Sequence, residues 1–139
     1  MAISFTAQYK KIKLLKSAAI KTWIESVITK EKRKTGNIHF IFVSDEELLK
    51  MNMQFLKHDT YTDIITFDYC EGKTINGDIF ISIDRVKENA IKFKTEFNDE
   101  LHRVMIHGVL HLCGYKDKTK KDAALIRKME NYSLNKRPF

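Results

Sequence analysis

Two histidines four positions apart, His107 and His111, are followed by a glycine, Gly114, and an aspartate, Asp117. On a helix, side chains at this spacing lie one turn apart on the same face, so both imidazoles can reach one metal ion. Gly114 can adopt the left-handed conformation that ends a helix, and the chain can then return to present Asp117 as a third ligand. Two imidazoles and one carboxylate leave a position open for water, which is typical of catalytic divalent metal sites. We therefore predict a metal centre at His107, His111 and Asp117.

This spacing of two histidines, a glycine and a third ligand is also that of the metzincin peptidases. In those enzymes a glutamate follows the first histidine and serves as the general base, whereas this chain has Gly108 at that position. The pattern therefore keeps the metal ligands and lacks the peptidase base. We expect one divalent metal per chain, with zinc as the default for nitrogen and oxygen ligands of this kind.

Three blocks of the sequence resemble the YbeY family of endoribonucleases, bacterial metalloenzymes of ribosomal RNA maturation. The residues His107–Tyr115 resemble the family signature HGxLHLxGYDH, Asn52–Phe67 is similar to LNxxYRxKDxPTDVLSF, and Gly77–Ser82 matches the GDIxIS strand. The blocks occur in the family's order, so the resemblance extends over most of the chain, from about Ile38 to about Met129.

The resemblance implies a metal-dependent, single-strand-specific endoribonuclease that acts in maturation of the small-subunit ribosomal RNA 3′ end and in ribosome quality control. Its partners would be a single-stranded ribosomal RNA precursor and the ribosomal subunit or its proteins. Because the second block resembles the family's active-site segment, His58, Asp59 and Asp63 are candidates for the catalytic base. Lys57 and Arg103 are candidates for contacts to RNA phosphate groups.

Three positions depart from the family pattern. Asp117 stands where the family has a third metal-binding histidine, so the three ligands together carry one more negative charge. Leu56 replaces an arginine, and the role of that arginine therefore does not transfer to this chain. Tyr61 replaces a proline, which removes a constraint on the backbone.

The composition is that of a globular protein. A chain of 139 residues is the length of one domain, and we expect a single metal-dependent endoribonuclease domain over residues 1–139. Hydrophobic residues at 43% and charged residues at 31% are typical of soluble proteins. The chain shows no secretion leader and no apolar run of about 18 residues, so we expect a cytoplasmic protein without a membrane partner. Cys70 and Cys113 fit no disulfide or CxxC zinc pattern, and we expect no disulfide partner.

The formal net charge of +7 favours a polyanionic partner. Lysine and arginine residues concentrate near positions 10–16, 30–34 and 116–137. Basic residues near the metal-binding loop would attract a phosphate backbone. Lysine-rich helices can also be merely solvated, so charge alone does not identify RNA as the partner.

The first half of the chain reads as strand, helix, strand, helix. Residues 3–7 alternate like a short strand, and apolar positions from Leu14 to Ile28 repeat at helical spacing. Gly36 and Asn37 are expected to close that helix before a strand at residues 38–43. Ser44 followed by Glu47 then predicts a capping box that opens the second helix.

The second half is predicted as a pair of strands followed by three helices. Residues 64–69 and 78–83 read as strands joined by a loop, and we expect them to pair antiparallel. Helices are expected over residues 85–94 and 100–113, with a last helix opened by a capping box at Thr119 and Asp122.

The predicted helix at residues 100–113 is apolar almost all round apart from its histidine stripe, which indicates a central position. The sequence therefore predicts an α+β fold in which a small mixed β-sheet of about four strands is covered by helices. The central metal-binding helix is expected to resemble that of zincin-type metalloproteins.

Three other functions are compatible with the pattern. The ligand spacing would suit a metallopeptidase, which Gly108 and the basic charge oppose. Two histidines and a carboxylate also form the facial triad of mononuclear iron oxygenases, although such triads more often sit on strands. The third alternative is a ribosome assembly factor that binds RNA without cleaving it and uses its metal structurally.

Overall fold

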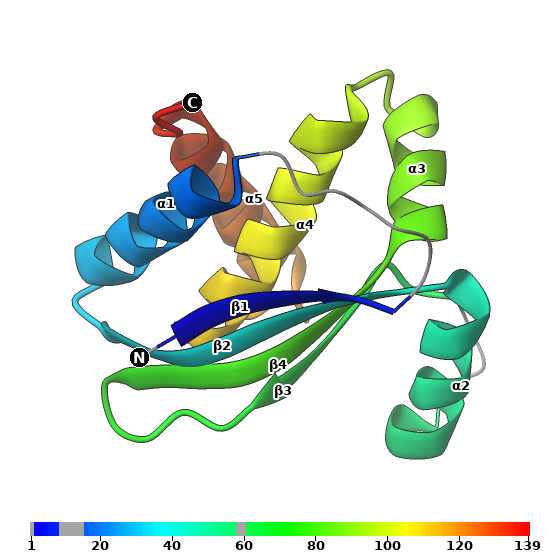
Figure 1. The fold of residues 1–139 in the computed structure, drawn as a ribbon, viewed down its shortest axis with the longest axis horizontal. Coiled ribbons are helices and arrows are strands. Elements are labelled where there is room, and N and C mark those ends of the chain that lie inside the picture. The colour runs from blue at the N-terminus through cyan, green and yellow to red at the C-terminus, as the bar shows by residue number, and fades with distance from the viewer. Residues whose placement is uncertain (1, 9–15, 58–60) are drawn as a thin grey trace.

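A four-stranded mixed β-sheet forms one layer of the molecule, and helices pack against it (Figure 1). The computed structural model describes residues 2–8, 16–57 and 61–139. In chain order the elements are β1 (Ala2–Ala7), α1 (Ser17–Lys30), β2 (Lys34–Val43), α2 (Asp45–Leu56), β3 (Ile64–Asp68), β4 (Thr74–Ser82), α3 (Ile83–Lys92), α4 (Phe97–Leu112) and α5 (Lys120–Asn135). The strand order is β1-β2-β4-β3, with β2 parallel to both β1 and β4 and with β3 antiparallel to β4. The predicted α+β fold with a small mixed sheet, including the antiparallel strand pair, is confirmed.

The main core lies between one face of the sheet and the layer that contains α1, α4 and α5 (Figure 1). Alternate residues of the two central strands point into it, because successive side chains of a strand face opposite sides. These residues are fully or almost fully buried: Ile38, Phe40, Phe42, Ile75, Ile79 and Ile81. Trp23 of α1 is buried in the same core, and its indole nitrogen donates a hydrogen bond of 2.8 Å to the Ser133 carbonyl of α5.

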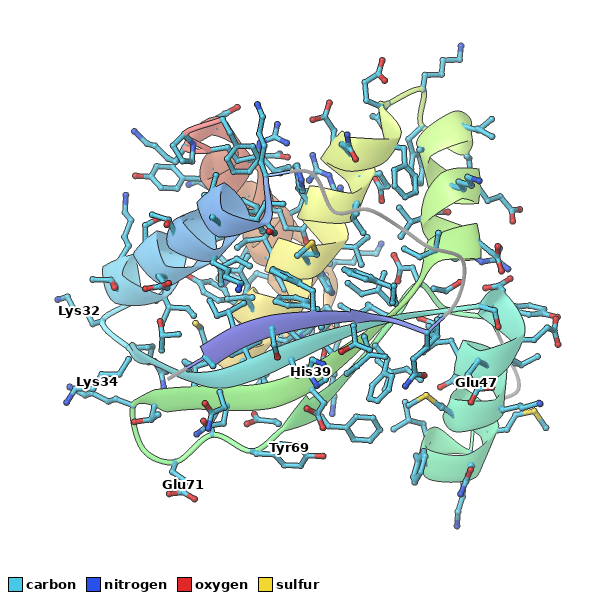
Figure 2. All side chains as sticks on the ribbon, in the orientation of Figure 1. Lys32, Lys34, His39, Glu47, Tyr69 and Glu71 are labelled. Atoms are coloured by element: carbon cyan, nitrogen blue, oxygen red, sulfur yellow. The ribbon has the colours of Figure 1, made fainter. Side chains whose placement is uncertain are left out.

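The opposite face of the sheet is only partly covered. Helix α2 packs on one end of it, where Ile41, Val43, Leu48 and Ile65 form a second buried cluster. The exposed Tyr69 extends from this same side, away from α1 (Figure 2). The sheet therefore has one face buried by several helices and one face that remains largely open.

Two helix starts occur where the sequence predicts them. The Ser44 hydroxyl accepts a hydrogen bond of 3.1 Å from the Glu47 backbone N–H, and Thr119 accepts one of 3.0 Å from Asp122. Each bond satisfies a backbone donor that has no partner within its own helix. Helix α4 begins three residues before the predicted start at residue 100. Helix α3 begins at Ile83, a residue that the sequence predicts as the end of the preceding strand. The helix begins here because the Ser82 hydroxyl caps it by accepting a hydrogen bond from the Arg85 N–H.

The Thr119 cap gives a testable effect on stability. We expect Thr119→Ala to lower the free energy of unfolding by about 1 kcal/mol, because the first turn of α5 loses an acceptor. Urea denaturation, monitored by circular dichroism, measures this change in the free energy of unfolding. Thr29→Ala, at an exposed position of α1, is the matched control. If both variants were as stable as the parent chain, the cap would contribute nothing.

The prediction that Gly36 and Asn37 end the first helix is wrong. Helix α1 ends at Lys30, and both residues lie within β2. The pairing of β2 with β4 shifts register between Thr35 and Ile38, and a Cβ at Gly36 would lie 2.7 Å from the carbonyl oxygen of Ile75. Glycine is therefore required here by a close approach of two strands rather than by a helix end.

Some predicted features have simple outcomes. Leu14, at the start of the first predicted helix, lies outside the described residues. Both cysteines are free thiols, and Cys113 is buried. Among residues 2–8, 16–57 and 61–139, no helix has the length and apolar character needed to cross a membrane.

Candidate metal centre

Helix α4 approaches the sheet very closely at Gly108. A Cβ at this position would lie 2.9 Å from Ile64 Cδ1 and 3.1 Å from Ile79 Cδ1, so the helix contacts both strands across its bare backbone. Successive helical residues are turned by about 100°, which directs the neighbouring His107 away from this contact. Gly108 therefore does more than leave the chain without the peptidase base: it is the position at which α4 packs against the sheet.

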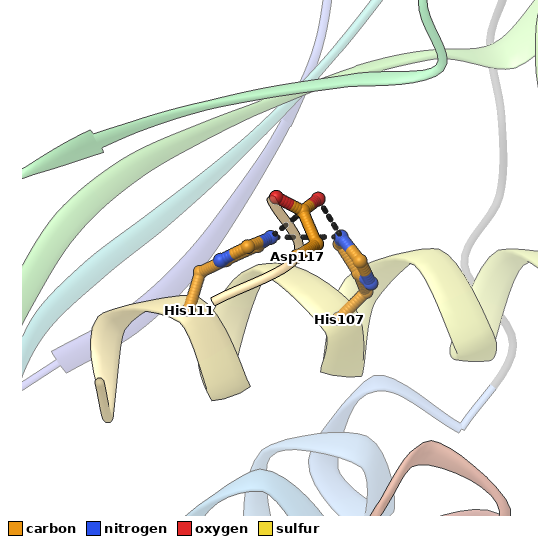
Figure 3. Close-up of side chains that lie close together, drawn as sticks. All are labelled: His107, His111 and Asp117. Atoms are coloured by element: carbon orange, nitrogen blue, oxygen red, sulfur yellow. Dashed lines mark hydrogen bonds and ion pairs between the residues drawn. The ribbon is translucent and has the colours of Figure 1, made fainter. Parts of the chain in front are cut away.

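The structure brings the three predicted ligands together (Figure 3). The Nε2 atoms of His107 and His111 are 2.9 Å apart, and Asp117 Oδ2 lies 3.7 Å from the former and 3.3 Å from the latter. The ligand atoms all lie within 4.8 Å of one another. This arrangement joins one face of α4 to the loop that follows it.

The loop returns to the site because α4 ends in a glycine turn. Gly114 has a φ angle of 107°, a conformation that would be strained for a residue with a side chain. The Tyr115 N–H donates to the Leu110 carbonyl and the Gly114 N–H to the His111 carbonyl, both at 3.0 Å, so the last carbonyls of the helix are satisfied. The predicted role of Gly114 is confirmed, and Asp117 follows three residues later.

Each ring also has a hydrogen-bond partner on the side that faces away from the site. His111 Nδ1 is 2.8 Å from the Tyr115 carbonyl oxygen, and His107 Nδ1 is 2.6 Å from Glu130 Oε2. A carbonyl or carboxylate oxygen only accepts, so each Nδ1 carries the hydrogen and each neutral ring directs the lone pair of Nε2 into the site. Two lone pairs facing each other beside a carboxylate suit a cation, and zinc binds such nitrogens at about 2.0–2.1 Å. The donor set therefore fits a divalent metal.

The charges around His107 are coupled. Burial alone would lower the pKa of His107, but the hydrogen bond that the ring donates to Glu130 and the negative charge of that carboxylate outweigh burial and raise this pKa above its usual value. Burial would raise the pKa of Glu130, and the contact with His107 reverses this and lowers it. In the metal-free protein the two shifts favour the charged form of each group, because the carboxylate and the protonated ring attract each other.

Asp63, one of the candidate bases, lines the same groove as the ligands. This groove has a volume of about 660 Å³ and is also lined by Leu56, Thr66, His107, His111, Asp117 and Lys118. Burial raises the pKa of Asp63 above its usual value, and the nearby His107 opposes that shift. The other two candidate bases, His58 and Asp59, lie outside the described residues.

The two candidate RNA contacts occupy different surroundings. Lys57 is an exposed residue at the C-terminal cap of α2 and is not among the residues that line the groove. Arg103 Nη1 donates to Glu130 Oε1 at 3.1 Å, so its head group is engaged behind the ligands. Arg103, His107 and Glu130 together line a second cavity of about 270 Å³.

Sequence reasoning missed Glu130. Glu130 is only 3% exposed although it is acidic. It contacts His107 from α5, 23 positions further along the chain. The available signal was its place on the buried stripe of that helix, four residues after Ile126 and three before Ser133. An acidic residue on such a stripe needs a partner, because a buried unpaired charge is costly.

Comparisons with known proteins agree with the sequence blocks. The family model described as Endoribonuclease YbeY matches residues 3–137. A protein named Endoribonuclease YbeY from Parabacteroides distasonis is 48% identical over 134 residues, which cover 96% of this chain and 94% of the relative. One of the same name from Flavobacterium psychrophilum is 55% identical over 112 residues, 81% of this chain and 80% of the relative. The solution structure of a Thermotoga maritima protein superposes with a TM-score of 0.70 at 31% identity and covers 96% of this chain and 87% of that one. The chain belongs to the YbeY endoribonuclease family.

Proposed function

We propose that this protein is a metal-dependent endoribonuclease that cleaves single-stranded RNA in the maturation of ribosomal RNA. Relatives 48% and 55% identical to it are named as endoribonucleases, which supports the reaction class. The observation that carries the metal dependence is the convergence of His107, His111 and Asp117 within 4.8 Å. We further propose that it acts in the cytoplasm on the 3′ end of small-subunit RNA, in contact with the ribosomal subunit or its proteins, and serves ribosome quality control.

The two histidines and the aspartate would contribute differently to metal binding. His107 and His111 would hold a divalent ion through Nε2, and Asp117 would add a negative charge. Zinc is the default choice for two imidazoles and one carboxylate. When bound, such an ion stabilises the charge that develops on a phosphate and makes water more acidic. Because no glutamate follows His107, a general base comes from another element.

Asp63 is the candidate base that the described groove supports best. It lines the groove beside His107 and His111. A carboxylate whose pKa is raised by burial holds a proton more readily at neutral pH than an ordinary one, which suits a general base. Lys118 lines the same groove and provides a positive charge for an approaching phosphate.

Metal removal tests this function. We expect a chelator to reduce cleavage of a fluorescent single-stranded RNA by the purified, untagged protein to background, and added zinc or manganese to restore it. A duplex of the same sequence should be cleaved more slowly, and casein should remain intact.

Several outcomes would contradict the proposal. Full RNA cleavage by metal-free protein would remove the metal dependence. Cleavage of casein but not of RNA would identify a metallopeptidase. Tight RNA binding by fully metallated protein without cleavage would identify an assembly factor with a structural metal.

A further inference from the structure

Glu130 of α5 lies behind the proposed metal centre, where it bonds to two residues of α4 and lies near an arginine of its own helix. Its side chain is only 4% exposed. Oε2 is 2.6 Å from His107 Nδ1, Oε1 accepts from Arg103 at 3.1 Å, and Arg127 lies 3.7 Å from Oε1. A buried carboxylate is retained at little cost only when several donors satisfy it, as they do here.

We infer that Glu130 is a positioning residue for the proposed metal centre. It fixes His107 as the tautomer with hydrogen on Nδ1 and thereby holds the Nε2 lone pair toward His111 and Asp117. The inference rests on the metal dependence proposed above and adds a residue that touches neither metal nor substrate. An outer carboxylate of this kind restricts rotation of a ligating ring and increases the basicity of its other nitrogen.

The two histidines are held in different ways. The Nδ1 of His111 donates to the backbone carbonyl of Tyr115 within its own turn, whereas that of His107 donates to a charged carboxylate from another helix. Hydrogen bonds to a charged acceptor are stronger than bonds to a neutral one. His107 should therefore be the more strongly oriented ligand, and its orientation depends on the docking of α5 against α4.

Arg103 completes this network. It lies one turn before His107 on α4, and its bond to Oε1 leaves Oε2 of Glu130 for the imidazole. The guanidinium also offsets the negative charge of the buried carboxylate. Arg103 thus acts on the ligand through Glu130, in addition to any contact it makes with RNA.

Zinc affinity of Glu130→Gln, measured without RNA by competition with a chromogenic chelator, tests the inference. We expect binding about 10–100-fold weaker than in the parent protein, the usual loss when a residue that hydrogen-bonds a metal ligand is removed. Asp99→Asn is the matched control on α4, because it also converts a carboxylate that bonds an arginine, Arg137 at 2.9 Å, but lies two turns before His107. Its zinc affinity should be unchanged.

A second measurement begins with the unmodified protein, so its first result does not depend on a variant that folds. Nitrogen-15 NMR of the metal-free chain, at alkaline pH where the rings are neutral, should report His107 with hydrogen on Nδ1. In Glu130→Gln this tautomer should be less populated. Denaturation of the metal-free variants separates a loss of zinc affinity from a loss of folding.

Three results would overturn the inference. These are a zinc affinity of Glu130→Gln within twofold of the parent, an equal loss in Asp99→Asn, or His107 with hydrogen on Nε2 in the unmodified protein. In each of these cases the parent protein would still bind zinc and cleave RNA, so the proposed function would stand. A parent protein that binds no zinc would instead refute the metal centre itself.

Discussion

Replacement of either His107 or His111 by alanine is expected to abolish RNA cleavage and to weaken zinc binding by more than about 100-fold. Loss of a residue that only hydrogen-bonds a metal ligand already weakens binding by about 10–100-fold. Each variant keeps a single imidazole, which together with Asp117 cannot form the three-ligand set. Both rings are about one-quarter exposed, with side-chain accessibilities of 22% and 26%, so their truncation should leave a folded domain.

The measurements are cleavage of single-stranded RNA, zinc affinity, and circular dichroism of each purified variant. His39→Ala is the matched control, because His39 lies on β2 and contacts Thr6, far along the chain from the ligands. This control should cleave RNA normally. Full activity of His107→Ala or His111→Ala would refute the metal centre.

The second large effect concerns folding. We expect Gly108→Glu to lower the free energy of unfolding by more than about 4 kcal/mol. This change introduces the glutamate that follows the first histidine in the metzincin peptidases. Its Cβ would lie 2.9 Å from Ile64 Cδ1 and 3.1 Å from Cδ1 of the fully buried Ile79, which is closer than ordinary van der Waals contact. The carboxylate would then be buried among apolar groups without a partner. The variant should be unfolded or nearly so at 37 °C, and it should gain no activity on casein.

Gly72→Glu separates this packing effect from the general effect of adding a glutamate. Nothing lies within 4 Å of a Cβ at Gly72, although its φ of 57° makes any side chain cost about 1–2 kcal/mol. Chemical denaturation of both variants measures the difference. Comparable stability of Gly108→Glu and Gly72→Glu would show that α4 can move away from the sheet at low cost.

The parts of the fold that depend on neighbouring residues could be predicted from the sequence. The caps at Ser44 and Thr119 act over three residues, so composition and spacing suffice to locate them. The same holds for the proposed metal ligands, because His107, His111 and Asp117 lie within eleven consecutive residues, on one helix and the glycine turn that follows it. Geometry of this kind is fixed by the backbone and needs no knowledge of distant elements.

Features that depend on distant residues could not be predicted in the same way. Gly36 has the type expected of a helix end, but its requirement comes from Ile75 and Asn76 on the neighbouring strand. The partner of His107 is Glu130, whose position is set by the packing of α5 on α4. Nothing in the local sequence of either element states which element it will meet.

The proposed orientation of His107 by a carboxylate from α5 would matter for shortened copies of the protein. A protease that removed the chain beyond a cut between Asp117 and Glu130 would keep all three proposed ligands in the remaining sequence but remove Glu130. Such a fragment would still contain the His107–Tyr115 motif, but its affinity for a metal ion would be low. We therefore expect proteolysis between residues 117 and 130 to lower nuclease activity without any cut within residues 107–117.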